Sequence, residues 1–110
     1  MAELVLLCAT ACQVTSYQPL VSQTDDSPNW TSIGEHVSRF GVAVSQDLLK
    51  SKKVKYGDTL YIPGYGYKVV NDCMNKRHNN AVDILVFTKA EERRVGVRHL
   101  KVWVVRQPHD

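Results

Sequence analysis

The stretch Asp72-Cys-Met-Asn-Lys-Arg-His-Asn-Asn-Ala-Val-Asp83 decides how the rest of the chain is interpreted. It holds two carboxylates, a basic pair and three asparagines between two apolar runs, Val69-Val70 and Ile84–Phe87. We expect a polar loop between two strands, where binding and catalytic residues often lie. An ionised Asp83 at the entrance to a buried strand is costly unless it is paired or used, so this residue is the first candidate for chemistry.

Short strands separated by Gly and Pro turns are predicted on both sides of this loop. A helical turn is expected at 46–50 after the cap Ser45, and a short helix at 89–95 from the capping box Thr88-x-x-Glu91 and the stop Gly96. Residues 15–34 are expected to form an irregular loop. The predicted strands are 4–14, 41–44, 59–62, 67–70, 82–87 and 100–105. Residues 1–110 are therefore expected to form a single mainly β domain, a small six-stranded barrel with one or two short helices.

Composition excludes few functions. The chain has 110 residues, 44% hydrophobic and 23% charged, with a net charge of +3, which is ordinary for a soluble globular domain. The basic run Lys50–Lys55 is more typical of a solvated turn than of a nucleic-acid contact, so we expect no nucleic-acid partner. No apolar run approaches the ~20 residues of a membrane span. The apolar start lacks a basic n-region, so we interpret it as a first strand, not as a signal.

The three cysteines are Cys8, Cys12 and Cys73. No C-x-x-C pair is present, so we expect no structural zinc site, and no other metal or cofactor is predicted. On one strand, Cys8 and Cys12 would lie about 13 Å apart, too far for a disulfide. Three free thiols are favoured, with a Cys12–Cys73 disulfide left as the alternative.

Several segments occur in the order found in one known family: Ala9-Thr10-Ala11-Cys12, Thr31–Gly34, Gly41–Ser45, Tyr56–Ile62 followed by Gly64–Gly66, Asp72, Asp83, Val95–Arg98 and Lys101–Val105. With these segments, the chain resembles the 3D (three-aspartate) domain, a double-psi β-barrel also found in MltA-type lytic transglycosylases and RlpA-like proteins. Two departures are Ser45, where the family has its first aspartate (Asp47 follows two residues later), and 73–77, where it has glycines.

The resemblance implies cleavage of MurNAc–GlcNAc links in peptidoglycan, outside the cytoplasm or in association with a phage. Asp83 would be the acid/base that yields 1,6-anhydro-MurNAc ends, and Asp72 its electrostatic neighbour. The alternative is a non-catalytic module that binds cell-wall glycan on the same barrel. Four residues are candidates for substrate contacts, with turn-forming or solvated roles left open: Thr31, Asp25, Arg77 and Tyr65.

An acid of this kind must keep its proton near neutral pH, which requires a pKa above the usual ~3.9. The apolar neighbours Val82 and Ile84 would raise the pKa of Asp83 through burial, and an ionised Asp72 would raise it further. Positive charge at 76–78 would oppose that shift if it lay close. The alternative role for both aspartates is structural, as acceptors of backbone N–H groups that hold a barrel together.

Overall fold

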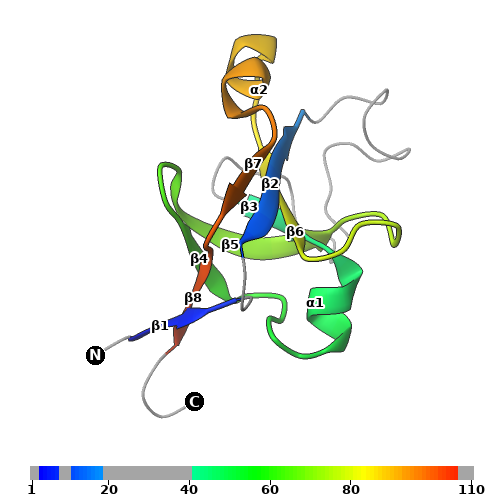
Figure 1. Ribbon diagram of the computed structural model, residues 1–110, viewed down its shortest axis with the longest axis vertical. Helices are drawn as coiled ribbons and strands as arrows, with labels where there is room; N and C mark the ends of the chain where they lie inside the picture. The colour runs from blue at the N-terminus through cyan, green and yellow to red at the C-terminus, as the bar shows by residue number, and fades with distance from the viewer. Residues whose placement is uncertain (1–2, 8–10, 19–40, 107–110) are drawn as a thin grey trace.

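The computed structural model describes residues 3–7, 11–18 and 41–106 (Figure 1). This part of the chain is mainly β, with two short helices, as the sequence predicts. Helices α1 and α2 lie far apart, at opposite ends of the molecule. The elements are β1 Glu3–Leu6, β2 Cys12–Tyr17, β3 Gly41–Val44, α1 Gln46–Lys50, β4 Thr59–Ile62, β5 Gly66–Cys73, β6 Ala81–Leu85, α2 Lys89–Val95, β7 Arg98–Leu100 and β8 Trp103–Arg106.

The eight strands form one mixed sheet in the order β1-β8-β4-β5-β3-β6-β2-β7. The sheet is not closed into a barrel within the described residues. The predicted number of six strands is wrong because two apolar runs, 4–14 and 100–105, each contain two strands. β1 pairs with β8 at one end of the sheet, while β2 pairs with β7 at the other. The two strands of each run therefore lie toward opposite ends of the sheet. Between β7 and β8, the Val102 carbonyl accepts the Leu7 amide at 2.8 Å.

Two other boundaries differ from the prediction. β5 continues to Cys73 because its last residues pair with β3, so Asp72 lies within a strand. The segment expected to be irregular begins as β2, which reaches Tyr17. Both helices begin and end where predicted. The Glu91 amide donates to Thr88 Oγ1 at 3.0 Å, and Gly96 has a positive φ of 59° at the end of α2.

The pairing reveals an internal duplication that the sequence does not show. The first unit is β2-β3-α1-β4 and the second unit is β5-β6-α2-β7. Each unit sends its second strand against the first strand of the other in a parallel pair, β3 with β5 and β6 with β2. The two second strands, β3 and β6, pair antiparallel at the centre. The order β4-β5-β3-β6-β2-β7 is thus symmetric about this central pair.

The main core lies on one face of the sheet. Alternate residues of the central strands point into it, among them Val42, Val44, Val82 and Ile84, all at most 2% exposed. Since side chains alternate across a strand, the residues between them face the opposite side. A second, smaller cluster forms there from Ala43, Met74 and Ala81, with Tyr17 packed against it. The candidate site lies on this second face.

Candidate functional site

Four residues form a row across four neighbouring strands, which we call the aspartate row: Asp72, Ala43, Asp83 and Thr15. The register pairs Asp72 of β5 with Ala43 of β3, Ala43 with Asp83 of β6, and Asp83 with Thr15 of β2. Directly paired residues point to the same face of a sheet. The two carboxylates are therefore separated by one small side chain, two strand spacings or about 10 Å between Cα atoms.

A β-bulge shapes the Asp72 end of the row. The register shifts between Val42 and Ala43, which leaves Asn71 as the extra residue of β5. The Asn71 side chain lies where a side chain at Gly41 would begin, since a Cβ there would meet its amide nitrogen at 2.6 Å. Gly41 and Ala43 thus leave room above β3, and the bulge lets Asp72 rather than Asn71 pair with Ala43.

The carboxyl group of Asp83 is strongly perturbed by its surroundings. It is half-buried, and Thr15 Oγ1 donates to its Oδ1 at 2.9 Å. Burial raises the pKa of Asp83 from 3.8 to about 6; the Thr15 hydrogen bond opposes this rise, whereas the charges of Glu92 and Asp72 add to it. At pH 7 such a group keeps its proton in roughly one molecule in ten, against fewer than about one in a thousand for an ordinary aspartate.

Asp72 is half-buried at the other end of the pair, and its Oδ1 accepts the amide of Cys73 at 2.9 Å. This local bond orients the carboxylate within its own strand. Asp83 thus accepts from a side chain, and Asp72 accepts from the backbone of its own neighbour in the chain.

Tyr17 and Thr15 are site residues that the sequence reasoning missed. Tyr17 lies two residues beyond Thr15 on the same face of β2, next to the small cluster. Burial and the charges of Asp72 and Asp83 raise the pKa of its phenol above the ordinary 10.0, so the hydroxyl remains a donor. Side chains alternate along β2, so Gln13, Thr15 and Tyr17 share one face. The predicted strand ends at residue 14, so the sequence prediction leaves Thr15 and Tyr17 in an irregular loop.

Ser45 and Asp47 hold the backbone at the start of β6. Ser45 is fully buried, and its Oγ accepts the amide of Ala81 at 3.0 Å. The Asp47 carboxylate accepts the amide of Asn80 at 3.1 and 3.3 Å. Asn80 has a positive φ of 54°, so these bonds stabilise a backbone conformation that is uncommon outside glycine. They position Asp83 two residues further along the strand.

The remaining candidates are not brought together with the aspartate row. Arg77 is exposed in the 74–80 segment, where its backbone amide donates to Asn75 Oδ1. Tyr65 packs against the main core, away from the second face. Thr31 and Asp25 lie outside the described residues. Cys12 and Cys73 are free thiols, with Cys12 buried, which favours the thiol expectation for these two; Cys8 also lies outside the described residues.

Comparisons with known proteins add no relative. A scan against protein-family models finds no match, and a search of the curated proteins finds no significant one. Neither helix of the described chain has the length and apolar run that spanning a bilayer would need. Among the described residues, no group of three or more His, Cys, Asp or Glu is placed to hold a metal ion. Any functional interpretation of the aspartate row therefore depends on the geometry described above.

Proposed function

We propose that this protein cleaves glycosidic bonds in peptidoglycan by lytic transglycosylation, with Asp83 as the acid/base. The observation that carries the proposal is the burial of Asp83 in a row that also holds a second carboxylate, an arrangement that raises its pKa to about 6. A carboxylic acid that retains its proton near neutral pH suits protonation of a glycosidic oxygen. The wall glycan itself comes from the resemblance to the three-aspartate family.

The duplicated sheet supports the double-psi β-barrel as the finer fold assignment. A double-psi barrel consists of two interlocked units, and here the units interlock through the parallel pairs β3 with β5 and β6 with β2. The consecutive strands β1 and β2 lie toward opposite ends of the open sheet, and so do β7 and β8. The proposed barrel would close where the chain passes between the two ends, without a continuous ladder of hydrogen bonds.

The proposed reaction needs one carboxyl group in two protonation states. Protonated Asp83 donates to the glycosidic oxygen as the bond from that oxygen to MurNAc C1 breaks. The resulting carboxylate then accepts the proton of the MurNAc C6 hydroxyl as its oxygen bonds to C1, which closes the 1,6-anhydro ring. Thr15 fixes the orientation of Asp83 through Oδ1. Asp72, about 10 Å away between Cα atoms, favours the positive charge that develops at C1.

Digestion of purified peptidoglycan tests this mechanism. The wild type should release 1,6-anhydro-muropeptides, identified by mass spectrometry, and Asp83→Asn should release them at least about a hundredfold more slowly. Glu3→Gln, a change of an exposed carboxylate on β1, is the matched control and should leave the yield unchanged. Release of only reducing-end sugars, or no release by the wild type, would refute the proposed reaction.

A second candidate, a non-catalytic glycan-binding module, is favoured by an aromatic row elsewhere on the sheet. Tyr61 of β4 pairs directly with Tyr67 of β5 and with Trp103 of β8, so the three side chains share one face. The Tyr61 and Tyr67 ring centroids are 5.0 Å apart, and Tyr67 is 60% exposed. Exposed rings in a row offer apolar faces against which sugar rings stack.

The binding candidate predicts a different pattern of variants. Pull-down with insoluble peptidoglycan should be weakened by Tyr67→Ala and unaffected by Asp83→Asn. Tyr56→Ala is the matched control, because Tyr56 is also exposed, at 38%, but lies outside the aromatic row. Retention that responds equally to Tyr56→Ala and Tyr67→Ala would contradict a specific aromatic surface.

A further inference from the structure

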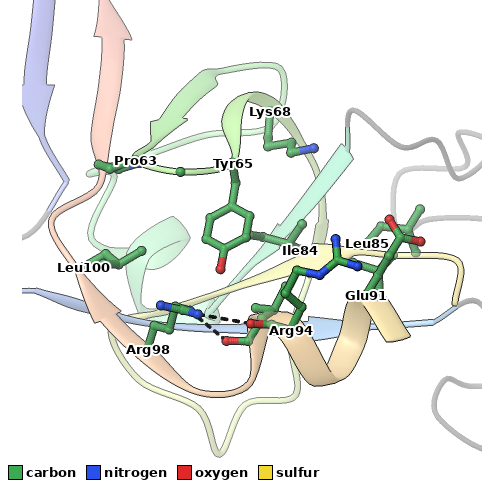
Figure 2. A pocket seen from close by; sticks show the side chains of 12 residues that line it. Pro63, Tyr65, Lys68, Ile84, Leu85, Glu91, Arg94, Arg98 and Leu100 are labelled. Atoms are coloured by element: carbon green, nitrogen blue, oxygen red, sulfur yellow. Dashed lines mark hydrogen bonds between the residues drawn. The ribbon is translucent and has the colours of Figure 1, made fainter. Parts of the chain in front are cut away.

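A pocket of about 470 Å³ opens where the main core reaches the surface, between the β4–β5 turn and α2 (Figure 2). This volume lies in the range of small-molecule sites. The lining residues include Tyr65 from the turn, Ile84 from β6 and Leu100 from β7. Asp72, Asp83 and Thr15 are not among them, so the pocket is separate from the aspartate row.

The polar lining of this pocket is predominantly positive. Arg94, Arg98 and Lys68 contribute three cations, against the single carboxylate of Glu91. That carboxylate accepts the Phe87 amide and the Thr88 hydroxyl, both at 3.2 Å, and so serves the start of α2. Neither guanidinium forms an ion pair within the described part of the chain. An anion is the ligand that would compensate the charges of these two guanidinium groups.

Arg98 is held in place before any ligand arrives. Its Nε donates to the Val95 carbonyl at 3.0 Å and its Nη2 to the Arg94 carbonyl at 3.1 Å (Figure 2). These bonds satisfy the carbonyl end of α2, which would otherwise repel an anion. Since a guanidinium carries five N–H donors, three remain for a ligand, in a side chain whose ordering has already occurred.

The rest of the lining is apolar and aromatic. Figure 2 shows the Tyr65 ring projecting from the β4–β5 turn toward the side on which Arg94 and Arg98 lie. Ile84, Val86 and Val95 also line the pocket but are at most 5% exposed, so its accessible apolar surface comes mainly from Tyr65 and Leu100, which are partly buried. A bare inorganic anion would leave the Tyr65 ring and Leu100 exposed to water, whereas an apolar or planar body attached to the anionic group would cover them.

We propose that this pocket binds a small organic anion, with a carboxylate or phosphate group held by Arg94 and Arg98 and an apolar or planar body against Tyr65. The planar guanidinium matches the oxygens of either group, which is the chemistry the two ligand types share. The proposal is independent of glycan cleavage because it uses no residue of the aspartate row.

Nuclear magnetic resonance titration of the ¹⁵N-labelled full chain tests the proposal. The probes are phenyl phosphate and benzoate, with inorganic phosphate and benzyl alcohol representing the anion and the apolar body alone. One or both organic anions should shift the Arg94 and Arg98 Nε–H signals and the amides of Gly64 and Leu100 saturably. The stronger of the two identifies phosphate or carboxylate as the preferred group. Each isolated fragment should bind about tenfold or more weakly than that probe.

Arg94→Gln should weaken the preferred probe about tenfold, because one charge-assisted contact is lost. Arg93→Gln is the matched control: Arg93 also lies in the last turn of α2 and is exposed, but it does not line the pocket. Binding by Arg93→Gln should remain within about twofold of the wild type. Equal losses in the two variants, inorganic phosphate binding as tightly as phenyl phosphate, or no saturable shift up to about 10 mM of either organic anion would overturn the proposal.

Discussion

The two units of the sheet have equivalent pairings but different chemistry. The second unit carries both carboxylates, Asp72 on β5 and Asp83 on β6. At the equivalent positions the first unit places Thr15 on β2 and Ala43 on β3. Each aspartate is thus paired with a residue of the other unit. The second unit therefore contributes both carboxylates. The first unit contributes the hydroxyl donor of Thr15 and the small side chain of Ala43 between the two aspartates.

This asymmetry explains why the row tolerates two carboxylates. Like charges directly opposite each other on neighbouring strands are destabilising. Ala43, only 3% exposed, keeps Asp72 and Asp83 one strand further apart, and Thr15 gives Asp83 a donor on its other side. Burial therefore remains the first cause of the raised pKa at Asp83, with the charge of Asp72 a smaller contribution.

The largest expected effect is on activity, and it should differ between the two carboxylates of the second unit. On peptidoglycan, Asp83→Asn should lower the turnover rate by about 10²–10⁴-fold, the usual contribution of a general acid/base. Asp72→Asn should lower it by less than about tenfold, because Asp72 acts only through its charge. Rates of anhydro-muropeptide release from the two variants measure this difference. Equal losses would mean that the aspartates act as one unit and that the assigned roles are wrong.

The next effect concerns stability, and its sign follows from the raised pKa. Asp83 binds its proton more tightly in the folded state, with a pKa of about 6, than at its ordinary 3.8. Wild-type stability should therefore fall as pH rises from about 4 to 6 and then level off. Asp83→Asn has no carboxyl group to titrate at this position. The unfolding free energy of the variant minus that of the wild type should therefore be higher at pH 8 than at pH 4, by up to about 3 kcal/mol.

Urea unfolding of both proteins at the two pH values measures this difference. Glu3→Gln, which removes an exposed carboxylate, is the matched control and should show no comparable change between them. A constant difference between Asp83→Asn and the wild type across the two pH values would show that the pKa of Asp83 is not raised on folding.

The third expected effect concerns the hydrogen bond between Ser45, which precedes α1, and Ala81 at the start of β6. Ser45→Ala leaves the buried Ala81 amide without its side-chain acceptor, which should cost about 1–3 kcal/mol of folding free energy. Ser51→Ala, at the other end of α1, changes an exposed residue and removes a long, 3.3 Å bond to the Leu48 carbonyl, which should cost less than about 0.5 kcal/mol. Chemical denaturation compares the two. Equal costs would show that Ser45 does not anchor β6.

The sequence predicted the elements whose signals are local. The capping box Thr88-x-x-Glu91 and the stop at Gly96 placed α2 correctly, because these bonds span only a few residues. No local signal of this kind marks where the apolar run 4–14 divides into β1 and β2. The strand boundary there depends on which partners, β8 or β6 and β7, pair with each part. Long-range pairing of this kind leaves little trace in local composition.

The same distinction applies to the site. Asp72 and Asp83 were identified from their flanking strands, and the register places them in one row. Thr15 is sixty-eight residues away from Asp83 in the chain, so its hydrogen bond could not be inferred without the parallel β2–β6 pair. Tyr65, a candidate for substrate contacts, lies instead at a separate pocket, because it belongs to the β4–β5 turn, where its side chain packs against the main core.

The smallest expected effect tests the contribution of the first unit to the chemistry of the second. Thr15→Val keeps the side-chain shape but removes the donor that lowers the pKa of Asp83, so this pKa should rise. Activity requires the protonated acid, and the wild-type rate should decline above a pH of about 6. In Thr15→Val this decline should begin at higher pH, as rate profiles of anhydro-muropeptide release will measure.

Glu92→Gln should lower the pKa of Asp83, because the charge of Glu92 raises it. In this variant the decline in rate should therefore begin at lower pH than in the wild type. If both variants moved the decline in the same direction, general damage to the site would explain the change better than the pKa of Asp83. Opposite displacements would locate the titration at Asp83, with a hydroxyl from one unit and a carboxylate from the other acting on it in opposite senses.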